Sequence, residues 1–220
     1  RYLTMCFVLV LNIRKTKLIL IDTYSSNAFY YALSIGLLSK LFQIPFIPIL
    51  HGSGLPKRYQ TSTAPINSLL KNSAINVTPS LFLKKQFRKH KVLTCYIPNT
   101  IDIENYRFKP RKFITPKLLW VRSFHKIYNP KMAIKVLHGV LKENQNTHLT
   151  MVGPNKDGSQ QSCMDLAERM GIAKQVTFAG LLPKKEWISL SEKSDIFINT
   201  THMDNMPVSI IEAMAVGFPI

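Results

Sequence analysis

Short apolar segments typical of β-strands alternate with segments of helical spacing along the chain. In the second half we predict strands over residues 117–121, 148–152, 176–179 and 195–199. The first of the helices between them is predicted to begin with Asn129 as N-cap and Pro130 in its first turn. Two more helices are predicted over 164–170 and 183–192. Strands that alternate with helices of this length indicate βαβ units and a parallel sheet.

The first half shows the same alternation, with predicted strands over 17–22, 44–50, 74–78 and 94–97 and helices over 28–41 and 80–91. A polar, basic stretch between Ile103 and Pro116 separates the halves, so we expect domains over 1–108 and 109–220. The predicted fold class is α/β, with two doubly wound, Rossmann-like domains that face a cleft. Ligands are then expected at the carboxyl ends of the strands.

The ends of the sequence indicate a fragment. No initiator Met is present, and the chain stops at Ile220 inside a motif, so we expect both domains to be truncated. The apolar run from Met5 to Ile13 is too short to span a bilayer. We predict that it forms a buried strand or the remnant of an earlier element.

Cysteine usage argues against a disulfide framework and against a zinc site. Cys6, Cys95 and Cys163 are far apart and odd in number, and no CxxC or Cys/His cluster occurs. A reducing compartment fits this usage, so we expect a cytoplasmic location.

Positive charge is concentrated in the first half. Of the chain's 29 Lys and Arg, 17 lie in residues 1–112, which hold only 3 of the 12 Asp and Glu. Such asymmetry indicates an anionic partner. The basic stretch 84–91, with Phe87 and other apolar residues beside it, is either a helix on a membrane surface or a solvated face above a packed apolar stripe. Nucleic acid is not expected, because no nucleic-acid-binding motif is present.

The last stretch of the chain combines an acidic loop with the start of a helix. Asp204, Asn205 and Met206 precede Pro207, where a helix is expected to open, and Glu212 follows eight positions after Asp204. The amides of a first helical turn, near Met206 to Val208, form a site for an anion such as a diphosphate. A carboxylate further along can accept hydrogen bonds from a diol such as a ribose.

Two further positions follow predicted strands. Arg122 comes directly after the strand 117–121, where a guanidinium can grip a diphosphate with two hydrogen bonds. Lys126 follows shortly after. His51 and Gly52 form a loop after the strand 44–50. A histidine is of interest there because its unperturbed pKa lies near neutrality.

Together these elements resemble the retaining family 4 glycosyltransferases, which have the GT-B fold. The resemblance covers about residues 18–220 and rests on four elements in the family's order: His51-Gly52, Pro98-Asn99-Thr100-Ile101-Asp102, the strand before Arg122, and the Asp204-x7-Glu212 segment with Pro207. Asp204 stands where the family usually has Glu, Thr100 where it has Gly, and Lys126 lies one position early.

The resemblance implies transfer of a hexosyl unit from a nucleotide-diphosphate sugar to a hydroxyl of a glycan or lipid-linked saccharide. It implies that Arg122 and Lys126 hold the donor phosphates, that Asp204 orients sugar hydroxyls and that Glu212 binds ribose. His51 and Gly52 would lie near the reacting sugar, and Gly180 beside the nucleotide base. No metal or other cofactor is expected, since positive protein groups would neutralise the diphosphate.

Three alternatives stay open at this point. The chain could be another GT-B enzyme, such as a nucleotide-sugar epimerase. It could be a non-catalytic module that binds anionic surfaces, including the inner face of a membrane. It could also be an inactive fragment of a glycosyltransferase.

Overall fold

A computed structural model describes residues 2–220. The chain divides between Asn99 and Thr100 into two compact units. This division lies before the boundary expected at residue 108, because the segment after Thr100 makes its contacts within the second unit. Each unit is described by itself.

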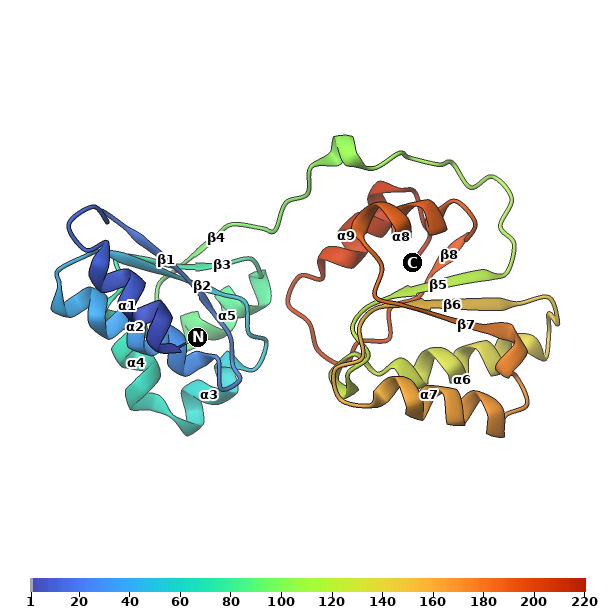
Figure 1. The fold of residues 1–220 in the computed structure, drawn as a ribbon, viewed down its shortest axis with the longest axis horizontal. Coiled ribbons are helices and arrows are strands. Elements are labelled where there is room, and N and C mark those ends of the chain that lie inside the picture. The colour runs from blue at the N-terminus through green and yellow to red at the C-terminus, as the bar shows by residue number, and fades with distance from the viewer. Residues whose placement is uncertain (1) are drawn as a thin grey trace. The chain divides into compact units, whose positions relative to one another are not determined.

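The first unit is a parallel sheet with helices packed against it (Figure 1). Its strands pair in the order β1-β2-β3-β4, which is also their order in the sequence. They are β1 (Ile19–Thr23), β2 (Phe46–Leu50), β3 (Asn76–Thr78) and β4 (Thr94–Tyr96). The strands predicted at these four places are therefore confirmed. Its helices are α1 (Tyr2–Leu11), α2 (Phe29–Leu41), α3 (Leu55–Thr61), α4 (Thr63–Asn72) and α5 (Leu81–Lys89).

The core of the first unit joins the strands to α2, α4 and α5. Phe29, Phe46 and Leu50 are among its fully buried members. Leu83 and Phe87 of α5 are also fully buried, so the basic residues of that helix cover a packed apolar stripe. The helices α3 and α4 were not predicted. The sequence of α3 is short and polar, with a proline in its first turn, and gives no apolar period. In α4 the buried residues Ile66, Leu69 and Leu70 do have helical spacing, which was a usable signal.

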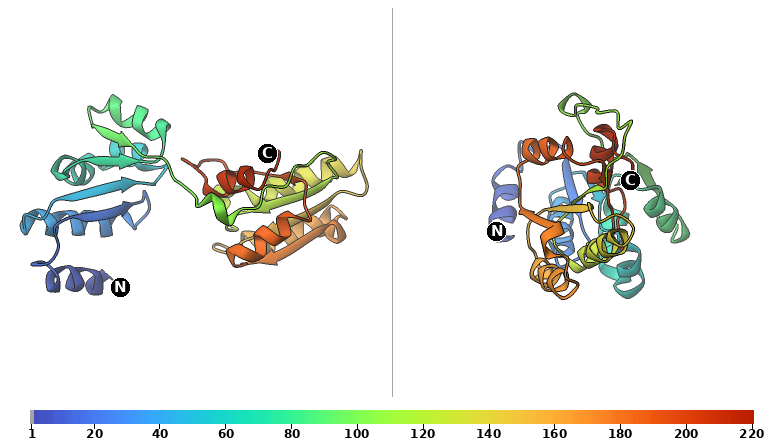
Figure 2. Two further views of the ribbon diagram at one scale, coloured as in Figure 1. Left: turned by 90° about the horizontal axis from the view of Figure 1, so that it is seen from above. Right: turned by 90° about the vertical axis from the view of Figure 1, so that its right-hand side faces the viewer.

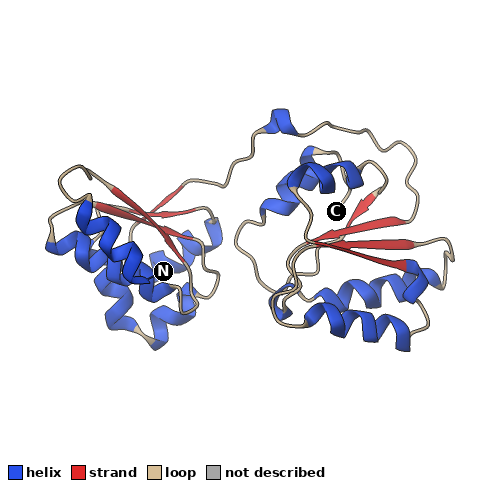
Figure 3. Cartoon of the chain, in the orientation of Figure 1, coloured by secondary structure: helices blue, strands red, loops and turns tan. Residues whose placement is uncertain are grey.

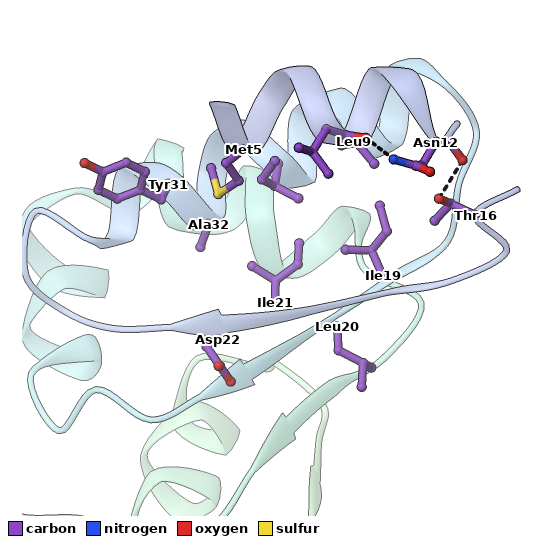
Figure 4. A pocket seen from close by; sticks show the side chains of 12 residues that line it. Met5, Leu9, Asn12, Thr16, Ile19, Leu20, Ile21, Asp22, Tyr31 and Ala32 are labelled. Atoms are coloured by element: carbon purple, nitrogen blue, oxygen red, sulfur yellow. Dashed lines mark hydrogen bonds between the residues drawn. The ribbon is translucent and has the colours of Figure 1, made fainter. Parts of the chain in front are cut away.

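The apolar run near the N-terminus forms the helix α1, so its prediction as a strand is wrong. A short apolar run without a period fits a strand and a helix equally well. None of the residues Tyr2–Leu11 is buried, although Met5, Cys6 and Leu9 pack against the first core. In Figure 2, α1 lies at the β1 end of the unit. Between α1, β1 and α2 lies a largely apolar pocket of about 510 Å³ (Figure 4).

The second unit has helices on both faces of a parallel sheet (Figure 3). Its strands pair in the order β7-β6-β5-β8. They are β5 (Lys117–Val121), β6 (His148–Val152), β7 (Val176–Gly180) and β8 (Ile196–Phe197), which confirms the strands predicted there. The helices are α6 (Pro130–Leu141), α7 (Ser159–Arg169), α8 (Lys184–Ser191) and α9 (Val208–Ala215).

Strand order in the second unit reverses at β5. The chain moves outward from β5 through β6 to β7, and then returns to the other side of β5 as β8. In open α/β sheets, ligands bind at the carboxyl ends of the strands beside such a reversal. The fold therefore singles out the ends of β5 and its neighbours.

Two apolar cores cover the two faces of this sheet. One holds Trp120, Phe124 and residues of α6 and α7. The other holds Leu119, Trp187 and residues of α9, together with Tyr106 from the segment that leads into the sheet. Asn129 occupies the N-cap of α6, as predicted, in a left-handed conformation (φ 49°), and its side chain makes no capping hydrogen bond. Pro130 does occupy the first turn.

Candidate functional site

A pocket of about 280 Å³ lies at the carboxyl ends of β5 and β6 and at the start of α9. It brings together three positions that the sequence singled out, Arg122, Val208 and Glu212. The other lining residues are Val121, Ser123, Tyr128, Val152, Gly153, Pro154, Leu181, Leu182, Trp187 and Ser209. The place of the pocket agrees with the reversal of strand order at β5.

Main-chain hydrogen bonds join the strand ends beside this pocket. The Arg122 amide donates to the Val152 carbonyl at 2.9 Å, and the Gly153 amide donates to the Gly180 carbonyl at 2.7 Å. Gly153 has φ +148°, and a Cβ there would lie 1.8 Å from the Arg122 carbonyl oxygen. Only glycine allows the β5 and β6 ends to approach this closely.

Arg122 is held between an acid and an aromatic ring. Its guanidinium forms an ion pair with Asp204 and lies 4.5 Å from the centre of the Tyr128 ring. Burial lowers the pKa of Arg122 below its ordinary value, and the guanidinium remains charged. Its Nε is buried and has no hydrogen-bond partner within residues 2–220. The group therefore has capacity for another acceptor, as an anion would provide.

Asp204 lies in the loop before α9. It is paired with Arg122, and its Oδ1 accepts a hydrogen bond from the Asn205 amide at 2.8 Å. Asn205, Met206 and Pro207 lead into the helix, which begins at Val208 with Pro207 at the N-cap. The helix therefore starts one residue later than the sequence predicts, since Pro207 is at the N-cap and not in the first turn.

Glu212 lies in α9 with its side chain largely buried. The residue is 7% exposed, and its Oε1 accepts a hydrogen bond from the Tyr106 hydroxyl at 2.6 Å. The Lys184 ammonium of α8 lies 2.9 Å from the same oxygen. Tyr106 and Lys184 were missed by the sequence reasoning. They are distant in the sequence from Glu212, and no local pattern connects them.

Lys126 borders a different pocket of about 430 Å³, beside the starts of α6 and α7. Its side chain is exposed, and its amide donates to Asp157 Oδ2 at 2.9 Å. Hydrogen bonds from Ser159 and from the Lys126 amide lower the pKa of Asp157 to about 2. The structure thus brings Arg122 and Glu212 into one pocket and places Lys126 at its neighbour.

His51 and Gly52 lie in the first unit, after β2. His51 Nε2 lies 3.0 Å from Asp22 Oδ1, and the imidazole stacks on the Tyr24 ring with 5.5 Å between ring centres. A Cβ on Gly52 would lie 2.4 Å from the Ser25 amide nitrogen, so the loop needs glycine there. Sequence reasoning missed Asp22, although its position at the end of a predicted strand was a usable signal.

Across residues 2–220, no three His, Cys, Asp or Glu side chains gather in a way that could hold a metal ion. Within the same described range, no helix has both the length and the apolar character needed to cross a membrane.

Comparison with known families identifies the second unit. Residues 102–220 match the family model described as glycosyl transferases group 1. This match spans more than half of the chain. The chain belongs to the glycosyl transferases group 1 family. Membership confirms the resemblance to glycosyltransferases, at the level of this broader family.

Solved structures of the same fold include several glycosyltransferases. Sucrose-phosphate synthase from Thermosynechococcus elongatus has a TM-score of 0.80 and 14% identity, with 98% of this chain and 58% of that chain covered. Anabaena HepE in complex with UDP and glucose has a TM-score of 0.77 and 18% identity, with 98% and 61% covered. The lipopolysaccharide outer core galactosyltransferase WaaB has a TM-score of 0.65 and 15% identity, with 98% and 58% covered.

These likenesses confirm the predicted α/β fold class, with the Rossmann-like, parallel-sheet units of GT-B glycosyltransferases. The chain spans about three fifths of the length of these structures. No curated protein matched the chain significantly.

Proposed function

We propose that the protein is a retaining glycosyltransferase. It transfers a hexosyl unit from a nucleotide-diphosphate sugar to a hydroxyl of a glycan or a lipid-linked saccharide. The observation that carries this proposal is the pocket in which Arg122, the start of α9 and Glu212 meet. Those groups can bind a diphosphate and a ribose.

The diphosphate is assigned to Arg122 and the first turn of α9. A guanidinium can bind a phosphate with two parallel hydrogen bonds, and the amides of a helix start favour an anion. An incoming diphosphate competes with Asp204 for Arg122, because both anions pair with the same guanidinium. Asp204, once released, can accept hydrogen bonds from the hydroxyls of the donor sugar.

The nucleoside is assigned to the part of the pocket between Gly153, Leu181 and Glu212. Glu212 accepts hydrogen bonds from the ribose hydroxyls, and the base lies beside Gly180 and Leu181. The HepE structures are complexes with UDP and glucose, with UDP, and with UDP-glucose, which supports a uridine donor as the first to be tested.

The proposed chemistry is electrostatic. The bond between the sugar's anomeric carbon and the diphosphate oxygen breaks, and the acceptor oxygen forms its bond to the same carbon from the same face. The acceptor's proton passes to the departing diphosphate. Arg122 and the α9 amides stabilise the charge that develops on the diphosphate. Lys126 adds positive charge from the neighbouring pocket, and no metal is used.

His51 is assigned to orienting the donor sugar or the acceptor. The imidazole is fixed by Asp22 and Tyr24, and the Gly52 amide donates to the Thr23 carbonyl at 3.2 Å. This loop at the ends of β1 and β2 can present a hydrogen-bonding group. The transfer reaction does not require it to act as a base.

Calorimetry with UDP tests the donor site directly. Arg122→Gln and Glu212→Gln should each weaken UDP binding by about tenfold to a hundredfold, because each removes a charge-assisted hydrogen bond. Arg169→Gln and Glu168→Gln are matched controls on the exposed face of α7 and should bind UDP as the parent chain does. Unchanged UDP affinity in Arg122→Gln and Glu212→Gln would count against the proposed function.

Donor choice and stereochemistry need the full-length protein. A panel of UDP-, GDP- and ADP-sugars, with release of the nucleotide as readout, identifies the donor. NMR of the transferred sugar then reports its anomeric configuration. Inversion at the anomeric carbon would refute the retaining assignment.

The first unit is proposed to contact an anionic membrane surface from the cytoplasmic side. On α5, Leu81 and Phe82 are 63% and 52% exposed beside Lys84, Lys85 and Arg88. Exposed apolar groups next to lysines are typical of interfacial helices. Co-sedimentation with phosphatidylserine vesicles should fall in a Leu81→Ser/Phe82→Ser variant. Equal sedimentation of this variant and the parent chain would exclude the exposed face of α5 as the membrane contact.

A further inference from the structure

The carboxylate of Glu212 is held from outside the pocket that it lines. Its Oε1 receives both the Tyr106 hydroxyl, at 2.6 Å, and the Lys184 ammonium, at 2.9 Å. Neither Tyr106 nor Lys184 lines the pocket. Their shortest link to a ligand in the pocket is therefore the Glu212 carboxylate.

The two partners come from separate parts of the second unit. Tyr106 lies in the segment that leads into β5, 106 positions before Glu212, and Lys184 lies in the first turn of α8. Tyr106 is 6% exposed, whereas the Lys184 side chain is 55% exposed. The Lys184 ammonium also lies 5.2 Å from the centre of the Tyr106 ring. The three side chains thus form one connected group, in which Tyr106 is buried and Lys184 is exposed.

We propose that Tyr106 and Lys184 are positioning residues that make the pocket selective for a vicinal diol, which in a nucleotide is the pair of ribose hydroxyls. This inference rests on the proposed nucleotide-binding function. With Oε1 held by two donors, the Glu212 carboxylate keeps one orientation and presents Oε2 to the ligand. A pre-oriented acceptor loses less side-chain freedom when the ligand binds.

The protonation states support this arrangement. Burial and the hydrogen bond to Glu212 raise the pKa of Tyr106 above its ordinary value, so the hydroxyl keeps its proton at neutral pH. Hydrogen bonds to Tyr106 and Glu212 raise the pKa of Lys184, so its ammonium stays charged. Both groups can therefore only donate to Glu212 under physiological conditions.

A purely structural role for the same contacts makes a different prediction. If Tyr106 and Lys184 only fasten α9 to its neighbours, their loss should lower stability and weaken every ligand of the pocket alike. If they orient Glu212 toward the diol, their loss should weaken only ligands that carry the diol. UDP and 2′,3′-dideoxy-UDP separate the two cases, because they share the base and the diphosphate.

The experiment compares these two nucleotides by calorimetry. Tyr106→Phe should lower the affinity for UDP by about tenfold, which corresponds to one lost hydrogen bond, and should leave 2′,3′-dideoxy-UDP within about twofold. Lys184→Gln should also weaken the binding of UDP more than that of 2′,3′-dideoxy-UDP, and Lys184→Arg should restore the affinity for UDP. Lys185→Gln on the same helix and Tyr59→Phe, which loses a 2.8 Å bond to Asn67 in the first unit, are matched controls.

Each outcome is decisive. Equal weakening of both nucleotides, or no weakening in either Tyr106→Phe or Lys184→Gln, overturns the positioning role while UDP binding by the parent chain stands. A parent chain that binds neither nucleotide overturns the proposed function, and this inference with it. If Tyr106→Phe does not fold, the exposed Lys184 variants still decide the question.

Discussion

Arg111 lies in the segment that leads into β5 and binds this segment to the rest of the second unit. Its removal should therefore lower the free energy of unfolding of that unit. Its guanidinium donates to four backbone carbonyls: Val216 at 2.6 Å, Ser191 at 2.9 Å, Lys109 at 3.2 Å and Ser194 at 3.3 Å. It also lies 3.8 Å from the centre of the Phe218 ring. Ser191 is the last residue of α8 and Val216 is the C-cap of α9, positions where carbonyls lack partners within the helix.

The expected loss follows from these contacts. Hydrogen bonds from a charged donor contribute about 1.5–3 kcal/mol each and are not additive, so we count only the two shortest, which gives about 3 kcal/mol or more for Arg111→Ala. For a unit of this size, that corresponds to a fall in Tm of roughly 12 °C. Arg111→Lys keeps the charge and loses the planar fork, so it should lose about half as much.

Tryptophan fluorescence follows this unit alone. The chain's only tryptophans, Trp120 and Trp187, are 1% and 5% exposed and both belong to the second unit. Urea unfolding followed at these residues therefore reports the second unit even if the first unfolds separately. Lys112→Ala, at the exposed neighbouring position, is the matched control and should change the free energy of unfolding by less than about 0.5 kcal/mol.

Two results would refute the reasoning about Arg111. A loss below about 1 kcal/mol for Arg111→Ala would mean that water replaces its hydrogen bonds at little cost. A lysine variant as stable as the parent chain would mean that charge alone matters, and that the four-carbonyl geometry does not.

Two further predictions concern the second unit. Because the folded pKa of Asp157 is about 2 against an ordinary 3.8, its contribution is present above pH 3.8 and is lost as pH falls toward 2. After allowance for exposure, Asp157→Asn should cost about 1 kcal/mol at pH 6, and the difference in urea unfolding should vanish near pH 2; a pH-independent difference would contradict this. Gly153→Ala should cost about 3 kcal/mol or more, because its Cβ meets the Arg122 carbonyl, whereas Gly139→Ala in the open face of α6 should gain about 0.5 kcal/mol. Equal unfolding midpoints for the two alanine variants would refute the close-approach argument.

Much of the fold could be predicted because the strands of the second unit are strongly patterned. The strands 117–121 and 148–152 were placed at the bounds that the structure gives them. The hydrophobic periodicity of the sequence failed as a guide where it is weak. An apolar run without a period was assigned to a strand and forms α1, and the short, polar sequence of α3 gave no helical period. In α4, by contrast, Ile66, Leu69 and Leu70 have helical spacing, so that helix was predictable.

The site was predictable only in part, for a related reason. Arg122 and Glu212 could be proposed because each lies in a short segment whose local pattern has a chemical meaning. Their placement in one pocket follows from the strand order, which the alternation of elements suggested. Tyr106 and Lys184 reach Glu212 through tertiary packing, and contacts of that kind leave no pattern in a single sequence.

The main-chain hydrogen bonds beside the pocket also bear on how its ligand preference can change. The hydrogen bonds from Arg122 to Val152 and from Gly153 to Gly180 use groups that every sequence shares, and the close approach at Gly153 excludes other residues. Variation during evolution, or in a directed-evolution library, is therefore restricted to the side chains of the walls, such as Leu181, Leu182 and Val208. New donor preferences should arise from changes at these side chains, while the main-chain hydrogen bonds stay constant.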